Sequence, residues 1–247
     1  GLNSFLAATH HAALAQAHGA RTIKSLQPDS IVGTTFSTSH IEAFSAKDRD
    51  VQAAKRADAL LNRLFVEPLL GLGYPTEEIK TLRKIEKFMQ ADDEKNLQFE
   101  MDFVGVQNYT REIVAHSYFI PYLRAKLVTA QDRQVPVTTM NWEVYTESLY
   151  HILKKYSAYE NMPPLMITEN GASFPDEVTR GKVHDPARTQ YLQDAIAHMR
   201  RAKDDGVDVR GYFVWTFLDN FEWAEGYDPR FGLVHVDFET QHRIIKD

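Results

Sequence analysis

Apolar residues along the chain fall into short continuous runs separated by longer stretches with helical spacing. Four of the runs are too short for a helix and are rich in β-branched or aromatic residues. We expect a strand in each of them, at 31–37 (IVGTTFS), 101–110 (MDFVGVQNYT), 165–169 (LMITE) and 209–217 (VRGYFVWTF). Strands that are apolar throughout are typical of parallel sheets covered by helices on both faces.

Helical spacing predicts the segments that lie between these strands. An Ala-rich helix is expected to begin after Ser4. A second helix is expected to begin at the capping box SAKD, residues 45–48, and to end before Pro68. Residues 75–100 are highly charged and predict helix only in pieces.

The second half of the chain continues the alternation. Residues 111–164 predict a long irregular insertion with one helix at 147–155, and Asp185 followed by Pro186 predicts the start of a last long helix. Strand and helix in alternation favour a (β/α)8 barrel. Eight units of about 30 residues would fit this length, yet only four convincing strands are found.

Polar side chains gather where three of the expected strands end. They are Gln107 and Tyr109, then Glu169 and Asn170, then Asp219 and Glu222. In parallel α/β folds the carboxyl ends of the strands are where sites are built. These residues are therefore expected to lie close together.

Composition narrows the classes of function. The 247 residues carry a net charge of −6, which disfavours a nucleic-acid partner, and contain no cysteine, which excludes disulfides and thiolate chemistry. No apolar run approaches the roughly 18 residues of a membrane span. The first residues lack the pattern of a targeting segment, which favours a cytoplasmic location. Neither a cofactor nor a metal is expected, and the oligomeric state is open.

The segment 215–232 (WTFLDNFEWAEGYDPRFG) combines aromatic rings with four carboxylates. Rings stack on the C–H face of a sugar and carboxylates accept hydrogen bonds from its hydroxyls, so the mixture suits a neutral polyol. Two other interpretations stay open. The cluster could be an aromatic lid over the core with surface acids, or Asp219 and Glu222 could belong to a calcium site. By itself, Glu169 could be a solvated carboxylate at a strand end.

Several motifs together resemble one family. They are HHAALAQAHGA, DFVGVQNYTR, NWEVY, ITENGAS and GYFVWTFLDNFEWAEGYDPRFGLVHVDFETQHR, and they cover essentially the whole chain. The sequence is similar to glycoside hydrolase family 1, the β-glucosidases and their relatives. The resemblance implies a (β/α)8 barrel of which this chain, residues 1–247, holds about strands 5–8 and helices 4–8.

The resemblance also implies roles for individual residues. Glu169, in the Thr-Glu-Asn-Gly motif, corresponds to the catalytic nucleophile, and Tyr109 to the tyrosine that hydrogen-bonds it. The residues expected to bind the substrate are Gln107, Trp142, Trp215, Glu222, Trp223 and Phe231. Gln107 stands where much of the family has Asn, which leaves its contact open. The implied substrates are non-phosphorylated β-glycosides, because a carboxylate at position 222 would repel a phosphate.

Retaining hydrolysis needs a second carboxyl group. The family's acid/base Glu lies in an Asn-Glu-Pro motif, and the one Glu-Pro pair here, Glu67-Pro68, follows Val66 in a helical stretch. The sequence therefore predicts the nucleophile-bearing half of a retaining β-glycosidase, whose partner is the N-terminal half of the same barrel. The alternative is a catalytically incomplete half-barrel that binds sugar or complements another chain.

Overall fold

The computed structural model describes all 247 residues, and its centre is a four-stranded parallel sheet. The strands are β1 (Gly33–Ser37), β3 (Phe103–Gln107), β6 (Leu165–Asn170) and β9 (Val209–Val214), in the order β1-β3-β6-β9. Each lies in one of the four segments predicted from the apolar runs, and β6 ends one residue beyond its predicted end. Those predictions are confirmed.

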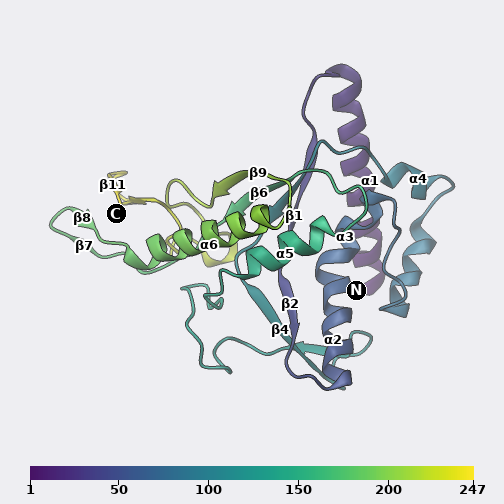
Figure 1. Cartoon of the computed structure of the whole chain (residues 1–247), viewed down its shortest axis with the longest axis horizontal. Helices are drawn as coiled ribbons and strands as arrows, with labels where there is room; N and C mark the ends of the chain where they lie inside the picture. The colour runs from purple at the N-terminus through teal and green to yellow at the C-terminus, as the bar shows by residue number, and fades with distance from the viewer.

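Long helices connect the strands. Figure 1 shows α5 and α6 running side by side along the sheet, with α1 and α2 at the opposite end of the molecule. The helical elements are α1 (Leu2–Leu26), α2 (Asp48–Asp58), the π-helical turn η1 (Ala59–Arg63), α3 (Leu64–Val66), α4 (Asp93–Leu97), α5 (Ser148–Ser157), α6 (Pro186–Asp204) and the 3-10 turns η2 (Pro68–Leu70), η3 (Lys80–Phe88) and η4 (Trp223–Glu225).

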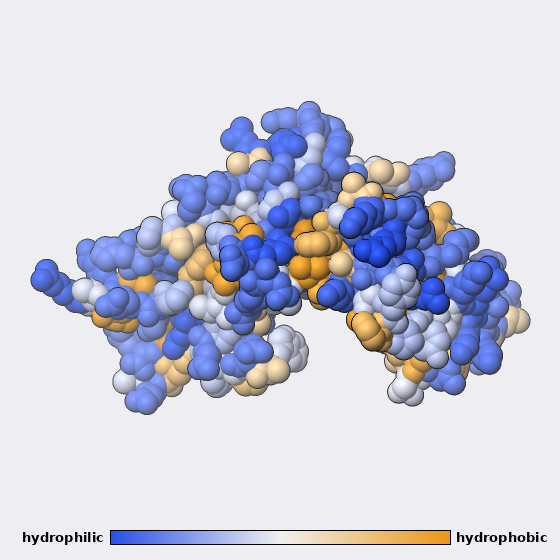
Figure 2. All heavy atoms as spheres, turned by 90° about the horizontal axis from the view of Figure 1, so that it is seen from below, coloured by the Kyte–Doolittle hydropathy of each residue, from blue (hydrophilic) through white to orange (hydrophobic).

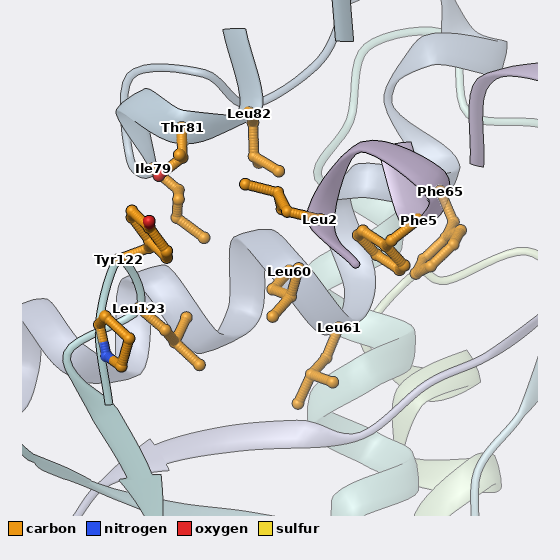
Figure 3. Close-up of a pocket in the computed structure, with 11 residues that line it drawn as sticks. Leu2, Phe5, Leu60, Leu61, Phe65, Ile79, Thr81, Leu82, Tyr122 and Leu123 are labelled. Carbon is orange, nitrogen blue, oxygen red and sulfur yellow. The ribbon is translucent and has the colours of Figure 1, made fainter. Parts of the chain in front are cut away.

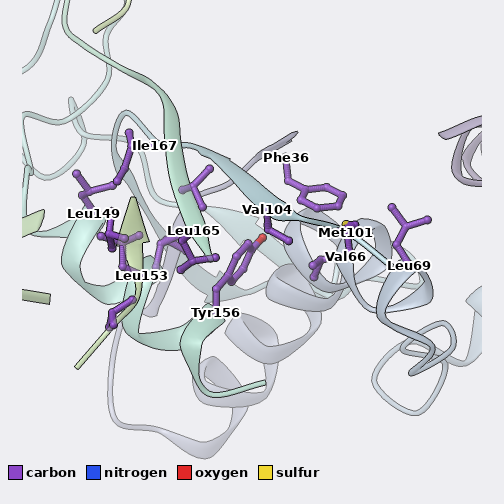
Figure 4. Packing of buried hydrophobic residues seen from close by; sticks show 14 of the residues in the cluster. Phe36, Val66, Leu69, Met101, Val104, Leu149, Leu153, Tyr156, Leu165 and Ile167 are labelled. Carbon is purple, nitrogen blue, oxygen red and sulfur yellow. The ribbon is translucent and has the colours of Figure 1, made fainter. Parts of the chain in front are cut away.

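The main core lies between the sheet and these helices. Val104 and Ile167 point from the strands toward the helices, where Leu149 and Leu153 of α5 meet them (Figure 4). Val106 belongs to the same cluster, and all five side chains are fully buried. Each such aliphatic side chain contributes about 1.5 to 3 kcal/mol on burial. Because successive side chains alternate across a strand, the residues between them face the other side of the sheet, where the hydroxyls of Thr35 and Thr168 meet at 2.5 Å.

The segment expected to be irregular contains a second sheet. β4 (Arg111–His116) pairs in parallel with β2 (His40–Ala43) and antiparallel with β5 (Ala125–Leu127), and α2 packs against this sheet. The prediction of an irregular stretch over residues 111–164 was therefore wrong in part. β4 follows β3 closely but leaves the central sheet, and its Val114 is fully buried in a cluster with alanines of α2. Short pairs also form between β7 (Val178–Thr179) and β8 (Lys182–Val183), and between β10 (Val234–Val236) and β11 (Arg243–Ile245).

Two expected helix caps are absent. The Ser45 hydroxyl donates to the Asp50 carboxylate at 2.5 Å, and the helix begins at Asp48 without a side-chain cap. Asp185 likewise makes no capping bond, because its carboxylate pairs with Arg188 one turn later at 2.8 Å. In both places the side chain that was expected to cap the helix binds another side chain instead of the free backbone N–H groups.

The central sheet is open at both edges. β1 pairs only with β3, and β9 pairs only with β6. Figure 2 shows the molecule as an arch, with apolar side chains gathered near the hollow between its two arms. None of the helices has the length and apolarity needed to span a membrane.

Candidate active site

Glu169 and Tyr109 meet at the carboxyl ends of β6 and β3. The Tyr109 hydroxyl donates a hydrogen bond of 2.6 Å to Glu169 Oε2. A shift in register after Val106 sets Gln107 opposite Glu169 and brings the two strand ends together. Burial, followed by this bond and the charge of Glu169, raises the pKa of Tyr109, so the phenol stays protonated and acts as a donor.

The next residue, Asn170, joins three parts of the fold through its buried side chain. Its amide donates to Asn108 O at 2.7 Å and to the Tyr191 hydroxyl of α6 at 3.2 Å, and its Oδ1 accepts from the Tyr212 hydroxyl of β9 at 2.7 Å. The Tyr191 hydroxyl donates in turn to Tyr109 O at 2.9 Å. We call these five residues the Asn170 frame; it fixes the backbone on either side of the Glu169–Tyr109 pair.

Gly171 allows β6 and β9 to approach each other just beyond this frame. A Cβ at this position would overlap the carbonyl oxygen of Trp215. The Trp215 N–H also donates to Asn170 O at 2.9 Å. The glycine of the Asn-Gly pair is thus required by close backbone contact.

Aromatic rings form a wall beside the carboxylate. The Trp142 ring lies 5.3 Å from the Tyr109 ring and 6.1 Å from the Phe231 ring, and Phe231 is 1% exposed. Glu143 anchors the segment that carries Trp142, because its carboxylate binds Arg111 at 2.8 Å and Arg133 at 2.7 Å. Burial opposes ionisation of Glu143, but these two hydrogen bonds outweigh it and hold its pKa below the usual value.

The loop after β9 brings a second carboxylate toward Glu169. The Trp215 indole donates to Glu222 Oε2 at 3.4 Å. Burial raises the pKa of Glu222, and the charge of Glu169 raises it further, while the indole bond opposes the change. Glu169 and Glu222 therefore share one electrostatic environment.

The raised pKa of Glu222 leads to a prediction about the stability of the fold. Because the folded state binds the Glu222 proton more tightly than the unfolded state does, ionised Glu222 destabilises the fold, and stability falls as pH rises from the ordinary carboxyl pKa through the raised one. Glu222→Gln should therefore be more stable than the parent at pH 7, and the gain should vanish below about pH 4. Urea unfolding at both pH values measures it; an equal gain at both would contradict this cause.

Asp219 holds the base of the same loop. Its Oδ1 accepts from Gly232 N at 2.8 Å and from Lys246 Nζ at 3.2 Å, and its Oδ2 accepts from Arg230 Nη1 at 3.1 Å and Val236 N at 3.2 Å. The carboxylate is fully buried. We call Asp219 with these partners the Asp219 hub; it fixes the two ends of the segment that carries Glu222 and Phe231.

The hub also bears on the calcium interpretation. Oxygens of Asp176 and Asp219 and a nitrogen of His235 lie within 4.8 Å of one another. Lys246 already supplies a cation there, 2.7 Å from Asp176 and 3.2 Å from Asp219, and its side chain is 1% exposed. Glu222 points instead to Trp215, so the Asp-x-x-Glu pair does not converge on one point.

The structure thus brings together most of the predicted site residues. Glu169, Tyr109, Trp142 and Phe231 are joined by direct contacts. Trp215 pairs with Glu222, whose pKa is raised in part by the charge of Glu169. Gln107 ends β3 with its side chain free of hydrogen bonds, and Trp223 is 81% exposed in η4. Sequence reasoning missed Asn108, Tyr191 and Tyr212. Of these three, only Tyr191 had a signal in the sequence, because its hydroxyl lies on the apolar face of the last helix and needs a partner there.

Comparison with known proteins identifies the family. The family model for glycosyl hydrolase family 1 matches residues 1–247. The chain belongs to glycosyl hydrolase family 1. Its family-1 relatives include β-glucosidase A of Thermotoga maritima, 39% identical over 242 residues, and β-glucosidase A of Acetivibrio thermocellus, 34% identical over 251 residues. These alignments cover 97% and 100% of this chain, and 53% and 55% of the relatives.

Solved family-1 structures share the fold. The Thermotoga maritima β-glucosidase in complex with deoxynojirimycin has a TM-score of 0.90 at 37% identity, covering 97% of this chain and 54% of that one. The psychrophilic β-glucosidase from Micrococcus antarcticus has a TM-score of 0.89 at 37% identity, covering 98% of this chain and 56% of that one. The predicted partial (β/α)8 barrel is confirmed, and the chain spans about half the length of the relatives it matches.

Proposed function

We propose that this chain carries the nucleophile of a retaining β-glycosidase that hydrolyses terminal β-D-glycosides. The observation that supports it most is the 2.6 Å hydrogen bond from Tyr109 to Glu169 at the carboxyl ends of two barrel strands. The bond leaves Glu169 Oε1 free to attack and holds the carboxylate in one orientation. Family membership supports the same reaction class.

The reaction proceeds in two displacements. Glu169 attacks the anomeric carbon, the bond to the leaving-group oxygen breaks, and a covalent glycosyl-enzyme forms; water then cleaves this ester and restores the carboxylate. Trp215 offers an aromatic face for the sugar ring, and Glu222 accepts from its hydroxyls. Trp142 and Phe231 form the wall next to the leaving group and the ring.

In this proposal the acid/base carboxyl comes from outside these 247 residues. Retention requires it about 5 to 5.5 Å from the nucleophile. Glu67 does not fit, because it is 7% exposed at a helix end and its carboxylate binds Arg63 at 2.6 Å and Tyr159 at 3.0 Å. We assign the acid/base to a polypeptide that completes the barrel, as a separate chain or as the rest of a longer one.

The glycone is a neutral sugar in this proposal. Glu222 already has a raised pKa beside Glu169, so a third negative charge from a sugar phosphate would be repelled. Neutral glucosides, galactosides and fucosides fit the combination of Trp215 and Glu222.

Covalent trapping tests the function. An activated 2-deoxy-2-fluoro-β-glucoside needs no acid to expel its leaving group, so the barrel completed with the acid/base polypeptide should gain one fluoroglucosyl group on the peptide containing Glu169. Mass spectrometry of the digest measures it. Binding of the sugar without turnover or label would favour the alternative, a sugar-binding or complementing half-barrel.

The Tyr109 hydroxyl makes a further prediction. Tyr109→Phe should lower kcat of the completed barrel on an aryl β-glucoside by about 10- to 100-fold, the value of one hydrogen bond to a charged group. Tyr118→Phe, at a side chain 75% exposed, is the matched control and should leave kcat unchanged. Equal rates for the two variants would remove Tyr109 from the mechanism.

A leaving-group series distinguishes the roles of the carboxyl groups. Glu222 has the raised pKa expected of a general acid, but its position against Trp215 suits hydroxyl binding. Glu222→Gln should therefore slow dinitrophenyl and methylphenyl glucosides by similar factors. If the dinitrophenyl substrate were spared, Glu222 would be the acid, because only poor leaving groups need a proton.

A further inference from the structure

A buried guanidinium lies where the loops after β6 and β9 meet. It belongs to Arg188 of α6, the helix that follows β6 and precedes β9, and its side chain is 2% exposed. Arginine is almost never buried to this extent unless its charge is paired. Asp185 lies 2.8 Å from Nη1 and Asp176 lies 3.6 Å from Nη2, so two carboxylates compensate the charge.

The same guanidinium binds the backbone of both loops. In the loop after β6, Nε donates to Ala172 O at 3.2 Å. In the loop after β9, Nη1 donates to Gly232 O at 2.5 Å and Nη2 donates to Arg230 O at 2.8 Å. A guanidinium is planar and presents its N–H groups in a rigid fork. The three carbonyl oxygens are therefore held in fixed positions relative to one another.

The contact in the first loop acts on the segment that carries Glu169. Ala172 is three residues beyond Glu169 and is fully buried. Between them, Gly171 lies against the carbonyl oxygen of Trp215, where a Cβ has no room. The loop after Glu169 is thus held between Trp215 and the guanidinium.

The contacts in the second loop act on the aromatic groups of the candidate site. Arg230 and Gly232 are the two neighbours of Phe231, so the guanidinium holds the backbone on both sides of this ring. Phe231 O in turn accepts from Thr216 N at 3.3 Å, and Thr216 directly follows Trp215. The segment that Arg188 binds therefore supports both aromatic side chains.

We propose that Arg188 is a positioning residue, which sets the distance between Glu169 and the sugar-binding groups of the loop after β9. The inference rests on the proposed function. Arg188 acts through the three carbonyl groups and does not contact the sugar. A misplacement of reacting groups by about 1 Å can cost about 10²-fold in rate. Loss of the bridge should therefore slow the attack of Glu169 while each loop keeps its own contacts with the sugar.

The rate of covalent labelling by an activated 2-deoxy-2-fluoro-β-glucoside tests this role. Arg188→Lys keeps the positive charge, but a single ammonium does not reproduce the fork that binds both loops. In the completed barrel, the first-order rate constant of labelling at saturating reagent should fall about 10²-fold. The half-saturating reagent concentration should change less than about threefold, since the sugar contacts persist.

The final extent of labelling separates positioning from folding. A purely structural role would reduce the fraction of folded molecules, and with it the extent of labelling, but would leave the rate constant of the folded molecules unchanged. For Arg188→Lys we expect the opposite pattern, which is full labelling at a lowered rate constant. Mass spectrometry over time measures both quantities.

A change at Asp185 separates the charge pair from the bridge. Asp185→Asn leaves Arg188 with one carboxylate, at 3.6 Å, but keeps all three carbonyl contacts. Urea unfolding should show lower stability, and the labelling rate constant should stay the same. Should Arg188→Lys not fold, the double variant Asp185→Asn/Arg188→Gln removes the pair as a whole, which is often nearly neutral for stability. It should show the same loss in rate constant, because one amide cannot bridge both loops.

Arg63→Lys is the control for an arginine outside the site. Arg63 binds Glu67 at 2.6 Å and Glu78 at 3.2 Å. It belongs to η1, whose Leu60 and Leu61 project into an apolar groove beside α1 (Figure 3). This change should leave the labelling rate constant as it is in the unaltered barrel.

The outcomes that contradict the two proposals differ. An unchanged labelling rate constant in Arg188→Lys or in the double variant would overturn the positioning role. So would a loss in Asp185→Asn as large as that in Arg188→Lys, because the bridge is intact there. Absence of label on the unaltered completed barrel would overturn the proposed function, on which the role of Arg188 rests.

Discussion

Glu169→Gln is expected to lower turnover of an aryl β-glucoside by the completed barrel by at least about 10⁴-fold, the scale of losing a covalent nucleophile. The amide keeps the size of the side chain and can still accept from the Tyr109 hydroxyl, so the frame around it should persist. The variant lacks the anionic oxygen that attacks the anomeric carbon. Steady-state rates with a single aryl glucoside measure the effect.

The control for this change is Glu177→Gln, at an exposed position just before β7. It removes one carboxylate and should leave turnover unchanged. The Glu169→Gln protein should also fail to acquire the fluoroglucosyl label. Undiminished turnover in Glu169→Gln would refute the assignment of the nucleophile.

Asp219→Ala is expected to destabilise the chain by about 3 to 5 kcal/mol, the cost of removing one partner from a buried ion pair. The Lys246 ammonium, 1% exposed, would keep Asp176 but lose its second carboxylate. The N–H groups of Gly232 and Val236 would lose their acceptors as well. Because these groups lie at the base of the loop with Glu222, sugar binding should weaken together with stability.

An exposed ion pair serves as the control, because removing its carboxylate shows the cost of losing one charge without losing the buried contacts of Asp219. Asp208 binds Arg210 at 2.8 Å, but the two side chains are 57% and 61% exposed. Asp208→Ala should cost at most about 1 kcal/mol, because exposed pairs contribute little. Urea unfolding of both variants makes the comparison. Equal costs would show that the Asp219 hub does not anchor the loop.

The sequence predicted those parts of the fold that local pattern controls. Each of the four parallel strands is a short apolar run ending in polar residues, so both their positions and the side of the sheet that carries Glu169 could be predicted. The family resemblance supplied the roles of Tyr109 and Trp142, and the structure places both beside Glu169. The roles themselves remain predictions.

The features that the sequence pattern did not predict depend on contacts between side chains of different elements. Ser45 has the spacing of a cap, yet Asp50 takes its hydroxyl. Val114 of β4 is buried because α2 packs on this strand, a contact that the sequence does not show. In the sequence, Tyr191 is one more apolar residue of α6, and only the position of Asn170 in space reveals that its hydroxyl is needed. The partners in each of these contacts are not related by helical or strand spacing, so the sequence pattern cannot predict that they meet.

The Asn170 frame has a consequence for how the two parts of the proposed active site depend on each other. All five of its residues belong to this chain, and so does the Tyr109 bond to Glu169. The orientation of Glu169, the proposed nucleophile, is therefore set by residues of this chain. In the proposed reaction, replacing the polypeptide that carries the acid/base would therefore leave the orientation of Glu169 unchanged.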